Sequence, residues 1–415
     1  MDLFNGVISI QGVPFFLLCV FAILVVGYLL GRITIKGVSL GDAGVFIIAL
    51  VFGVLFCSSF ATDTLGMSEP IVFDGKWLKI VESLGLILFV TSVGFIAGPK
   101  FFGNFKRNFK SYVLLGLIII LAGGVAAAGC IYAGEIFGYG GKINDQDGFV
   151  AMIVGLLSGS LTSTPAFSAA KATVSAEYEG LVSVGHGIAY IFGVVLFVQL
   201  IPKMAKADMA KERELIAIKQ DANAMEKKKR TFHFDHMGIC VFSLAAILGT
   251  VVGAIKIPLS GKGLDGTCFA LTTTGGCLLV SLALGHFGGF GKVSLMPAES
   301  TLKLFRELGL VLFLVGAGIP GGAEFVANFD AMYFVYGVVM TIVPLILGYL
   351  FARYVLKLSL LNNLGSITGG MTSTPALGTL IGVAGTEDVA SAYAATYPIA
   401  LIAVVFLSQF LIILF

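Results

Sequence analysis

One pentapeptide, Thr-Ser-Thr-Pro-Ala, occurs twice in this chain, at 162–166 and at 372–376. Each copy lies inside an apolar segment and follows a glycine, Gly159 or Gly369, three residues upstream. Proline lacks the N–H that a helix interior needs but suits the first turn of a helix, and a preceding threonine can cap that turn. Each copy therefore predicts a helix that breaks and restarts at Thr164/Pro165 or Thr374/Pro375, after an arm loosened by the glycine.

The chain around these motifs has the composition of a membrane protein. Of its 415 residues, 57% are hydrophobic and 12% are charged, whereas soluble domains carry about 25% charged residues. A charged stretch, 202–234, separates two apolar halves. About twelve apolar segments long enough for membrane helices or hairpins follow one another: 12–31, 38–60, 78–98, 111–133, 148–174, 180–201, 236–255, 266–286, 303–322, 331–353, 361–383 and 390–413. This predicts an all-α polytopic membrane protein.

The two halves are repeats. Leu84–Phe89 matches Leu308–Phe313, and Gly94 and Gly98 then match Gly318 and Gly322 without a gap. At equivalent places farther on, Lys100 and Lys106 of the first half become Glu324 and Asp330. Because Lys and Arg prefer cytoplasmic loops, this change of charge predicts that the repeats cross the membrane in opposite directions.

Charge counting also bears on the first hairpin. If 148–174 enters and leaves on the same side, 20 of the 26 Lys and Arg residues face the cytoplasm, whereas a full crossing leaves 9. The re-entrant arrangement is favoured, and the repeat extends it to 361–383. The sequence thus predicts two inverted membrane repeats, 1–201 and 235–415, each with five spans and one hairpin. Both termini are expected outside, and 202–234 is expected to be a solvated cytoplasmic tether.

The two restarting helices are expected to meet near the membrane midplane. Each N-terminus carries about half a positive charge, so together they would bind a small anion or zwitterion without Lys or Arg. Free carbonyls at the ends of the first arms leave Na⁺ open as a coupling ion. This predicts a secondary carrier, with an anion channel as the alternative from another class. The candidate binding residues are Thr162, Ser163, Thr164, Pro165, Thr372, Ser373, Thr374 and Pro375.

Several other residues are candidates for supporting roles. Gly94 and Gly318 are expected to allow close helix contact beside the hairpins. His186 is ionisable and lies in an apolar segment, which makes it a functional candidate or a packed core residue. Its counterpart in the second half, Thr396, adjoins Tyr397.

Charged residues also lie at the ends of the apolar segments. Glu82 and Glu307 occupy similar places at helix starts, and an interfacial ion pair with Arg306 or Lys303 is expected for Glu307. Lys171 either closes an outer gate or snorkels to the surface, and snorkelling is favoured.

Other functions find no support in the sequence. The six cysteines are scattered singly, so no metal site or disulfide framework is predicted. A net charge of +2 and basic residues confined to short loops predict no nucleic-acid partner. There is no GxSxG, no phosphate-cradling loop and no pair of carboxylates in a polar pocket, so no enzymatic activity is predicted.

The doubled motif resembles that of the aspartate:alanine exchanger family of bacterial inner-membrane carriers. The likeness rests on Gly155-x3-Gly159-x2-TSTPA, its copy at 365–376, and the LGLxLF…GxxxG block of each half. A more distant likeness is to glutamate:sodium symporters. The resemblance implies exchange of amino acids or dicarboxylates, with cation-coupled symport as the alternative. Many family members have large regulatory domains between the halves, and here only 202–234 stands there. We expect an elevator-type carrier in a homodimer.

Overall fold

The computed structural model describes residues 2–3, 8–35, 38–39, 41, 43–138, 143, 145–204, 209–216, 234–258, 268–290, 293–386 and 389–415. The elements of the first half are β1 (Asp2–Leu3), β2 (Ile8–Ser9), α1 (Gly12–Gly31), β3 (Thr34–Ile35), β4 (Val38–Ser39), α2 (Ala43–Cys57), α3 (Phe60–Asp63), α4 (Gly75–Asn108), α5 (Leu114–Phe137), α6 (Gln146–Ser160), α7 (Thr164–Thr173) and α8 (Glu179–Met204). Those that follow are α9 (Met209–Ile216), α10 (Ile239–Gly253), β5 (Lys256–Pro258), β6 (Cys268–Ala270), α11 (Thr272–Phe287), β7 (Gly289–Phe290), β8 (Val293–Ser294), α12 (Glu299–Asn328), α13 (Ala331–Leu350), α14 (Leu360–Gly370), α15 (Thr374–Ala384) and α16 (Val389–Leu414).

The main helices follow the same order in both halves. A helix, a short antiparallel ribbon and a second helix come first, as α1–β3–β4–α2 and as α10–β5–β6–α11. A long helix, a further helix, two short helices and a final long helix follow in each half. Helices dominate as expected, and the short two-stranded ribbons were not predicted.

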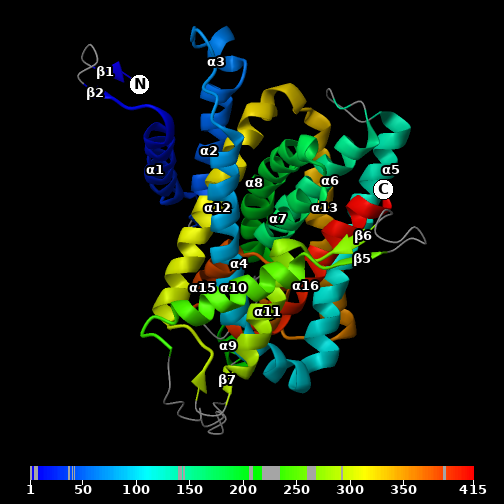
Figure 1. Cartoon of the computed structure of the whole chain (residues 1–415). Helices are drawn as coiled ribbons and strands as arrows, with labels where there is room; N and C mark the ends of the chain where they lie inside the picture. Colours follow the sequence, from blue (N-terminus) through cyan, green and yellow to red (C-terminus); the bar gives the residue numbers. More distant parts are fainter. Residues whose placement is uncertain are drawn as a thin grey trace.

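The long helices α4 and α12 pack against each other through matched glycines. Gly85 and Gly309 occupy the same place in the repeated LGLxLF block, and a Cβ added at either one would overlap the backbone of the other helix. Glycine allows this close approach because it has no side chain. Around this crossing, α11 packs on α4 as α2 packs on α12, so each half packs one helix against the long helix of the other half (Figure 1).

Gly94 and Gly318 also lie at close helix contacts, as predicted. A Cβ on Gly94 would overlap Ser281 and the backbone of α11, and one on Gly318 would meet Ala49 on α2. The partner helices are therefore α11 for Gly94 and α2 for Gly318.

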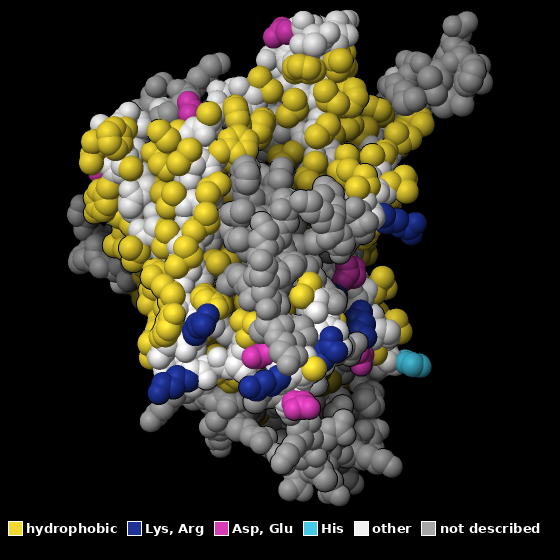
Figure 2. Space-filling view, turned by 180° about the vertical axis from the view of Figure 1, so that it is seen from behind, with side chains coloured by type: hydrophobic (Ala, Val, Ile, Leu, Met, Phe, Trp, Pro, Cys, Tyr) yellow, Lys and Arg dark blue, Asp and Glu magenta, His cyan; other side chains and the backbone are white. Residues whose placement is uncertain are grey.

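The hairpin helices form the centre of the molecule. Every described side chain of α6 from Gly148 to Ser160 is buried, and α6 packs along α8 as α14 packs along α16. Six described helical segments are long and apolar enough to cross a membrane, whereas α2, α10 and α11 are shorter apolar helices. Figure 2 shows apolar side chains over much of one face, with charged side chains gathered toward one end.

Part of the charged linker is docked and is not a free tether. Helix α9 packs on α14. The Glu212 carboxylate accepts a hydrogen bond from the Leu360 N–H at 2.9 Å, and the Arg213 Nε donates to the Ala384 carbonyl at 2.5 Å. A negative group thus meets the N-terminus of α14 and a positive group meets the C-terminus of α15, as helix dipoles favour. Linker residues 205–208 and 217–233 lie outside the described part.

Candidate functional site

The first TSTPA copy breaks the helix as predicted. Thr162 has a φ of 51°, in the left-handed region that glycine usually occupies at helix ends. The Thr162 N–H donates to the Gly159 carbonyl at 2.9 Å and the Ser163 N–H to the Ser158 carbonyl at 2.8 Å. This is a Schellman ending, which satisfies the last carbonyls of α6.

The second copy repeats this geometry. Thr372 has a φ of 52°. The Thr372 N–H donates to Gly369 and the Ser373 N–H to Thr368, both at 3.0 Å. The two breaks are therefore equivalent in backbone conformation and in hydrogen bonding.

The caps of the restarting helices lie one residue earlier than predicted. Ser163, and not Thr164, is the N-cap of α7, and its hydroxyl accepts a hydrogen bond from the Ala166 N–H at 3.4 Å. Ser373 holds the same position in α15 but makes no cap bond, and its buried hydroxyl has no partner among the described residues. Pro165 and Pro375 lie in the first turn of α7 and α15, where no N–H is missed. The side chains of Thr374 and Pro375 are outside the described part.

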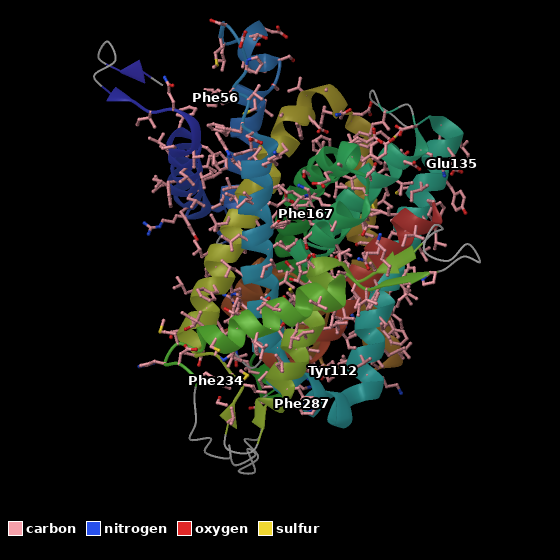
Figure 3. The ribbon with its side chains drawn as sticks, in the orientation of Figure 1. Phe56, Tyr112, Glu135, Phe167, Phe234 and Phe287 are labelled. Carbon is pink, nitrogen blue, oxygen red and sulfur yellow. The ribbon has the colours of Figure 1, made fainter. Side chains whose placement is uncertain are left out.

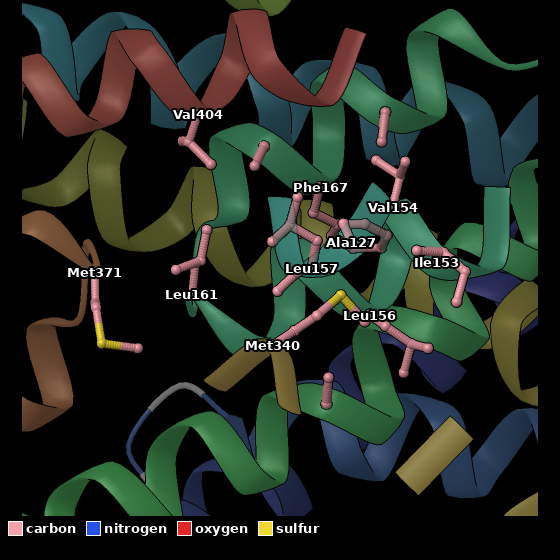
Figure 4. Packing of buried hydrophobic residues seen from close by; sticks show 14 of the residues in the cluster. Ala127, Ile153, Val154, Leu156, Leu157, Leu161, Phe167, Met340, Met371 and Val404 are labelled. Atoms are coloured by element: carbon pink, nitrogen blue, oxygen red, sulfur yellow. The ribbon is translucent and has the colours of Figure 1, made fainter. Parts of the chain in front are cut away.

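The two tips meet and hydrogen-bond to each other. The Thr372 hydroxyl donates to the Leu161 carbonyl at 3.0 Å, and the Thr162 hydroxyl donates to the Met371 carbonyl at 3.5 Å. Leu161 and Met371 precede the two threonines, and Figure 4 shows them on neighbouring ribbons. Each threonine therefore binds the end of the opposite arm.

These contacts give the site both donors and acceptors. The N-termini of α7 and α15 lie beside the contact and contribute positive potential. Thr162 and Thr372 are buried, and Ser163 and Ser373 are only 1% exposed. No charged side chain bonds either tip within the described ranges. The arm-end carbonyls that the sequence offered to Na⁺ already accept the threonine hydroxyls.

Gly159 and Gly369 allow close packing of the hairpin arms against neighbouring helices. Both lie inside regular helix. A Cβ at Gly159 would overlap the His186 carbonyl and stand 2.8 Å from the Tyr190 nitrogen on α8. One at Gly369 would stand 2.5 Å from the Tyr393 carbonyl on α16. A helix packed this closely against another helix has no room for a side chain at either position.

His186 is a buried core histidine next to the first hairpin. Its Nδ1 lies 2.8 Å from the Ser158 hydroxyl, and its ring stacks on Phe167 with centroids 4.1 Å apart. Phe46 meets it edge-on. Phe167 occupies the middle of the helix bundle in Figure 3. The Nε2 has no partner in the described chain, so His186 braces the arms of the hairpin and does not reach the tips through any described contact.

Tyr397 also lies outside the tip contacts. Its ring stacks on Tyr393, with centroids 5.0 Å apart, and it packs against the cluster that contains Phe89 and Val90. The interfacial ion pair expected for Glu307 is present, since Arg306 Nη2 lies 2.5 Å from its carboxylate.

Lys171 departs from its prediction. Its side chain is only 4% exposed, and its Nζ lies 2.8 Å from Glu82 Oε1, so it does not snorkel. Glu82 is likewise buried, at 8% exposure. The sequence places these two opposite charges in apolar segments, where charged side chains are expected to form ion pairs. That they pair with each other depends on how α7 packs.

A family model described as a predicted permease membrane region matches residues 19–206 and 241–413. The chain belongs to the aspartate–alanine exchanger family. The match stops and resumes around the linker, so both membrane halves carry the family pattern. Together with the apolar helices, it makes this chain a multi-pass membrane transporter.

Two relatives align with this chain over nearly the full length of both proteins, and a third aligns over a shorter region. An uncharacterized transporter of Bacteroides fragilis is 25% identical over 94% of this chain and 96% of its own length. Another, from Bacteroides thetaiotaomicron, is 24% identical over the same shares. An uncharacterized transporter of Desulfotalea psychrophila is 34% identical over 40% of this chain and 30% of its own length. The first alignment covers 555 positions, more than the 415 residues here, so that relative carries inserted residues.

Proposed function

We propose that this transporter exchanges small zwitterionic amino acids, such as aspartate or alanine, across the bacterial inner membrane. The observation that carries the proposal is the reciprocal hydrogen bonding of the tips, in which the Thr162 and Thr372 hydroxyls donate to Met371 and Leu161. A substrate that enters between the tips has to replace these bonds, because buried polar groups without partners are costly.

The composition of this contact distinguishes substrate classes. Parting the tips frees two hydroxyl donors and two carbonyl acceptors, next to two helix N-termini. A carboxylate matches the hydroxyls and the N-termini. An ammonium matches the carbonyls of Leu161 and Met371. An amino acid supplies both groups, whereas a dicarboxylate leaves the two carbonyls unpaired, which favours the amino acid.

The remaining features belong to the same proposal. The Lys and Arg distribution supports inverted repeats with both termini outside and 202–234 in the cytoplasm. Corresponding helices pack on each other in the two halves, which supports two related hairpins that alternate access. We expect an elevator motion and a homodimer.

Exchange is tested in proteoliposomes. Uptake of labelled alanine or aspartate should require amino acid inside, and Thr162→Val/Thr372→Val should abolish it. Thr250→Val is the matched control, because that hydroxyl donates to the Ala246 carbonyl within α10 and lies 4.0 Å from the Cys277 sulfur on α11, away from the tips. Uptake into empty vesicles under a Na⁺ or pH gradient would favour symport, and conductive flux would favour the channel. Wild-type exchange by the double variant would remove the tips from the site.

A further inference from the structure

A second polar site lies at the base of the first hairpin, away from the tips. Lys171 on α7 and Glu82 on α4 form an ion pair of 2.8 Å. Both side chains are more than nine-tenths buried, at 4% and 8% exposure. Charges this far from water are tolerated only when each compensates the other.

The surroundings of the pair leave one negative charge in excess. Glu179 Oε2 lies 3.8 Å from Lys171 and 2.6 Å from the half-exposed Lys79, which is itself 3.9 Å from Glu82. The Glu324 carboxylate of α12 lies against Gly180, at the position that a Cβ would take. It is also attracted electrostatically by Lys171. Two lysines therefore face three carboxylates.

Within the described chain, the ion pairs of Glu82 are those with Lys171 and Lys79. α12 presents Gly316, whose absent side chain leaves room for Glu82. α11 presents His286 near Gly98, and α16 presents Tyr397 to Phe89 and Val90. These places are about two turns or more farther along α4.

Separating α7 from α4 would leave the Glu82 carboxylate without its ion-pair partner. Lys171 leaves with the hairpin arm, and Lys79 is already engaged by both carboxylate oxygens of Glu179. A buried carboxylate without a partner takes up a proton, because the neutral acid is far cheaper to bury than the ion.

We propose that Glu82 and Lys171 form a proton-linked switch, in which opening of the first hairpin at α7 replaces Lys171 by a proton on the Glu82 carboxylate and closing releases that proton. This rests on the proposed function in taking that hairpin as a moving element. The second hairpin has no such site, since Arg306, Ile381 and Val389 stand where the first half has Glu82, Lys171 and Glu179. The proton comes from water, and one is bound for each opening.

Hydrogen exchange of the α7 amides tests the site without any substrate. In purified protein, the opening equilibrium of 164–173 should rise as the pH is lowered, by up to about tenfold per pH unit, because opening binds one proton. Exchange is corrected for its intrinsic pH dependence with α10 as internal reference. Glu82→Gln should exchange faster and lose the slope, and Glu299→Gln, from an exposed pair with Lys303, should behave as wild type.

A second variant guards against misfolding. Lys171→Met alone leaves Glu82 buried and unpaired, whereas Glu82→Gln/Lys171→Met removes both charges and is expected to fold and to show no slope. A wild-type slope in Glu82→Gln or in the double variant overturns the proposal. The tip variants separate the two proposals: if they transport normally while the slope still follows Glu82, the proposed substrate site is wrong and the proton-linked switch remains.

Discussion

Thr372 combines backbone strain with a side-chain hydrogen bond. Its φ of 52° lies in the left-handed region, where a residue other than glycine costs about 1–2 kcal/mol. Its hydroxyl reaches the Leu161 carbonyl of the other hairpin at 3.0 Å. Three substitutions separate these two effects, and they form our most direct prediction.

Thr372→Val keeps the shape and the strain but removes the donor. The buried Leu161 carbonyl then loses its partner, which destabilises the protein by about 1–3 kcal/mol. Thr372→Gly loses the same bond but relieves the strain, so its stability should fall within about 1–2 kcal/mol of wild type. Thr372→Ser keeps the hydroxyl and should match wild type most closely.

Thermal unfolding in one detergent should therefore rank the proteins as wild type and Ser above Gly, and Gly above Val. Stabilisation by added amino acid should follow a different order, with Ser retaining it and both Gly and Val losing it. Thr162→Val should have a smaller effect than Thr372→Val, because its hydrogen bond is longer, at 3.5 Å. A valine variant as stable as wild type, or a glycine variant less stable than valine, would refute the reasoning.

Three further predictions concern packing, the linker and pH. Gly159→Ala should destabilise by about 1–3 kcal/mol in the same melt, because its Cβ overlaps α8. Gly129→Ala in α5 should not, since no atom lies within 4 Å of its Cβ, and equal effects would contradict the packing argument. Glu212→Ala and Arg213→Ala should each speed hydrogen exchange at the base of the second hairpin a few-fold, as loss of about 0.3–1 kcal/mol at a helix end implies. Glu214→Ala on the same helix is the control, and no difference between them would show that α9 does not hold the hairpin. A hydrogen bond to the Asp145 carboxylate raises the pKa of Tyr178 to about 12. Since the protonated phenol is favoured, its stabilisation is present at neutral pH and is lost as pH rises through that value. An absorbance titration, differenced against Tyr178→Phe, should show ionisation nearer the ordinary range in Asp145→Asn, and an unchanged titration would remove the Asp145 bond as the cause.

The breaks could be predicted because their causes are local. Pro165 and Pro375 have no N–H to donate, and neighbouring Ser and Thr offer caps, whatever surrounds them. The repeated motif, and the match between Gly85 and Gly309, also indicated that the two halves are internal repeats. Only the exact cap, Ser163 in place of Thr164, was missed. The N-cap is the last residue outside the helix, and Ser163 takes that position because its backbone is extended and α7 begins at Thr164.

Contacts between distant segments depend on the packed structure. Whether Thr372 reaches Leu161, whether Lys171 pairs with Glu82 and whether α9 docks on α14 are questions about helices far apart in the chain. A motif records its own backbone preferences, but it says nothing about the partner that packing brings to it. The sequence by itself determined two broken apolar helices in a repeated membrane protein, because proline and apolar length act locally. The tertiary structure decided what the freed polar groups bind, because that depends on which helices lie within hydrogen-bonding distance.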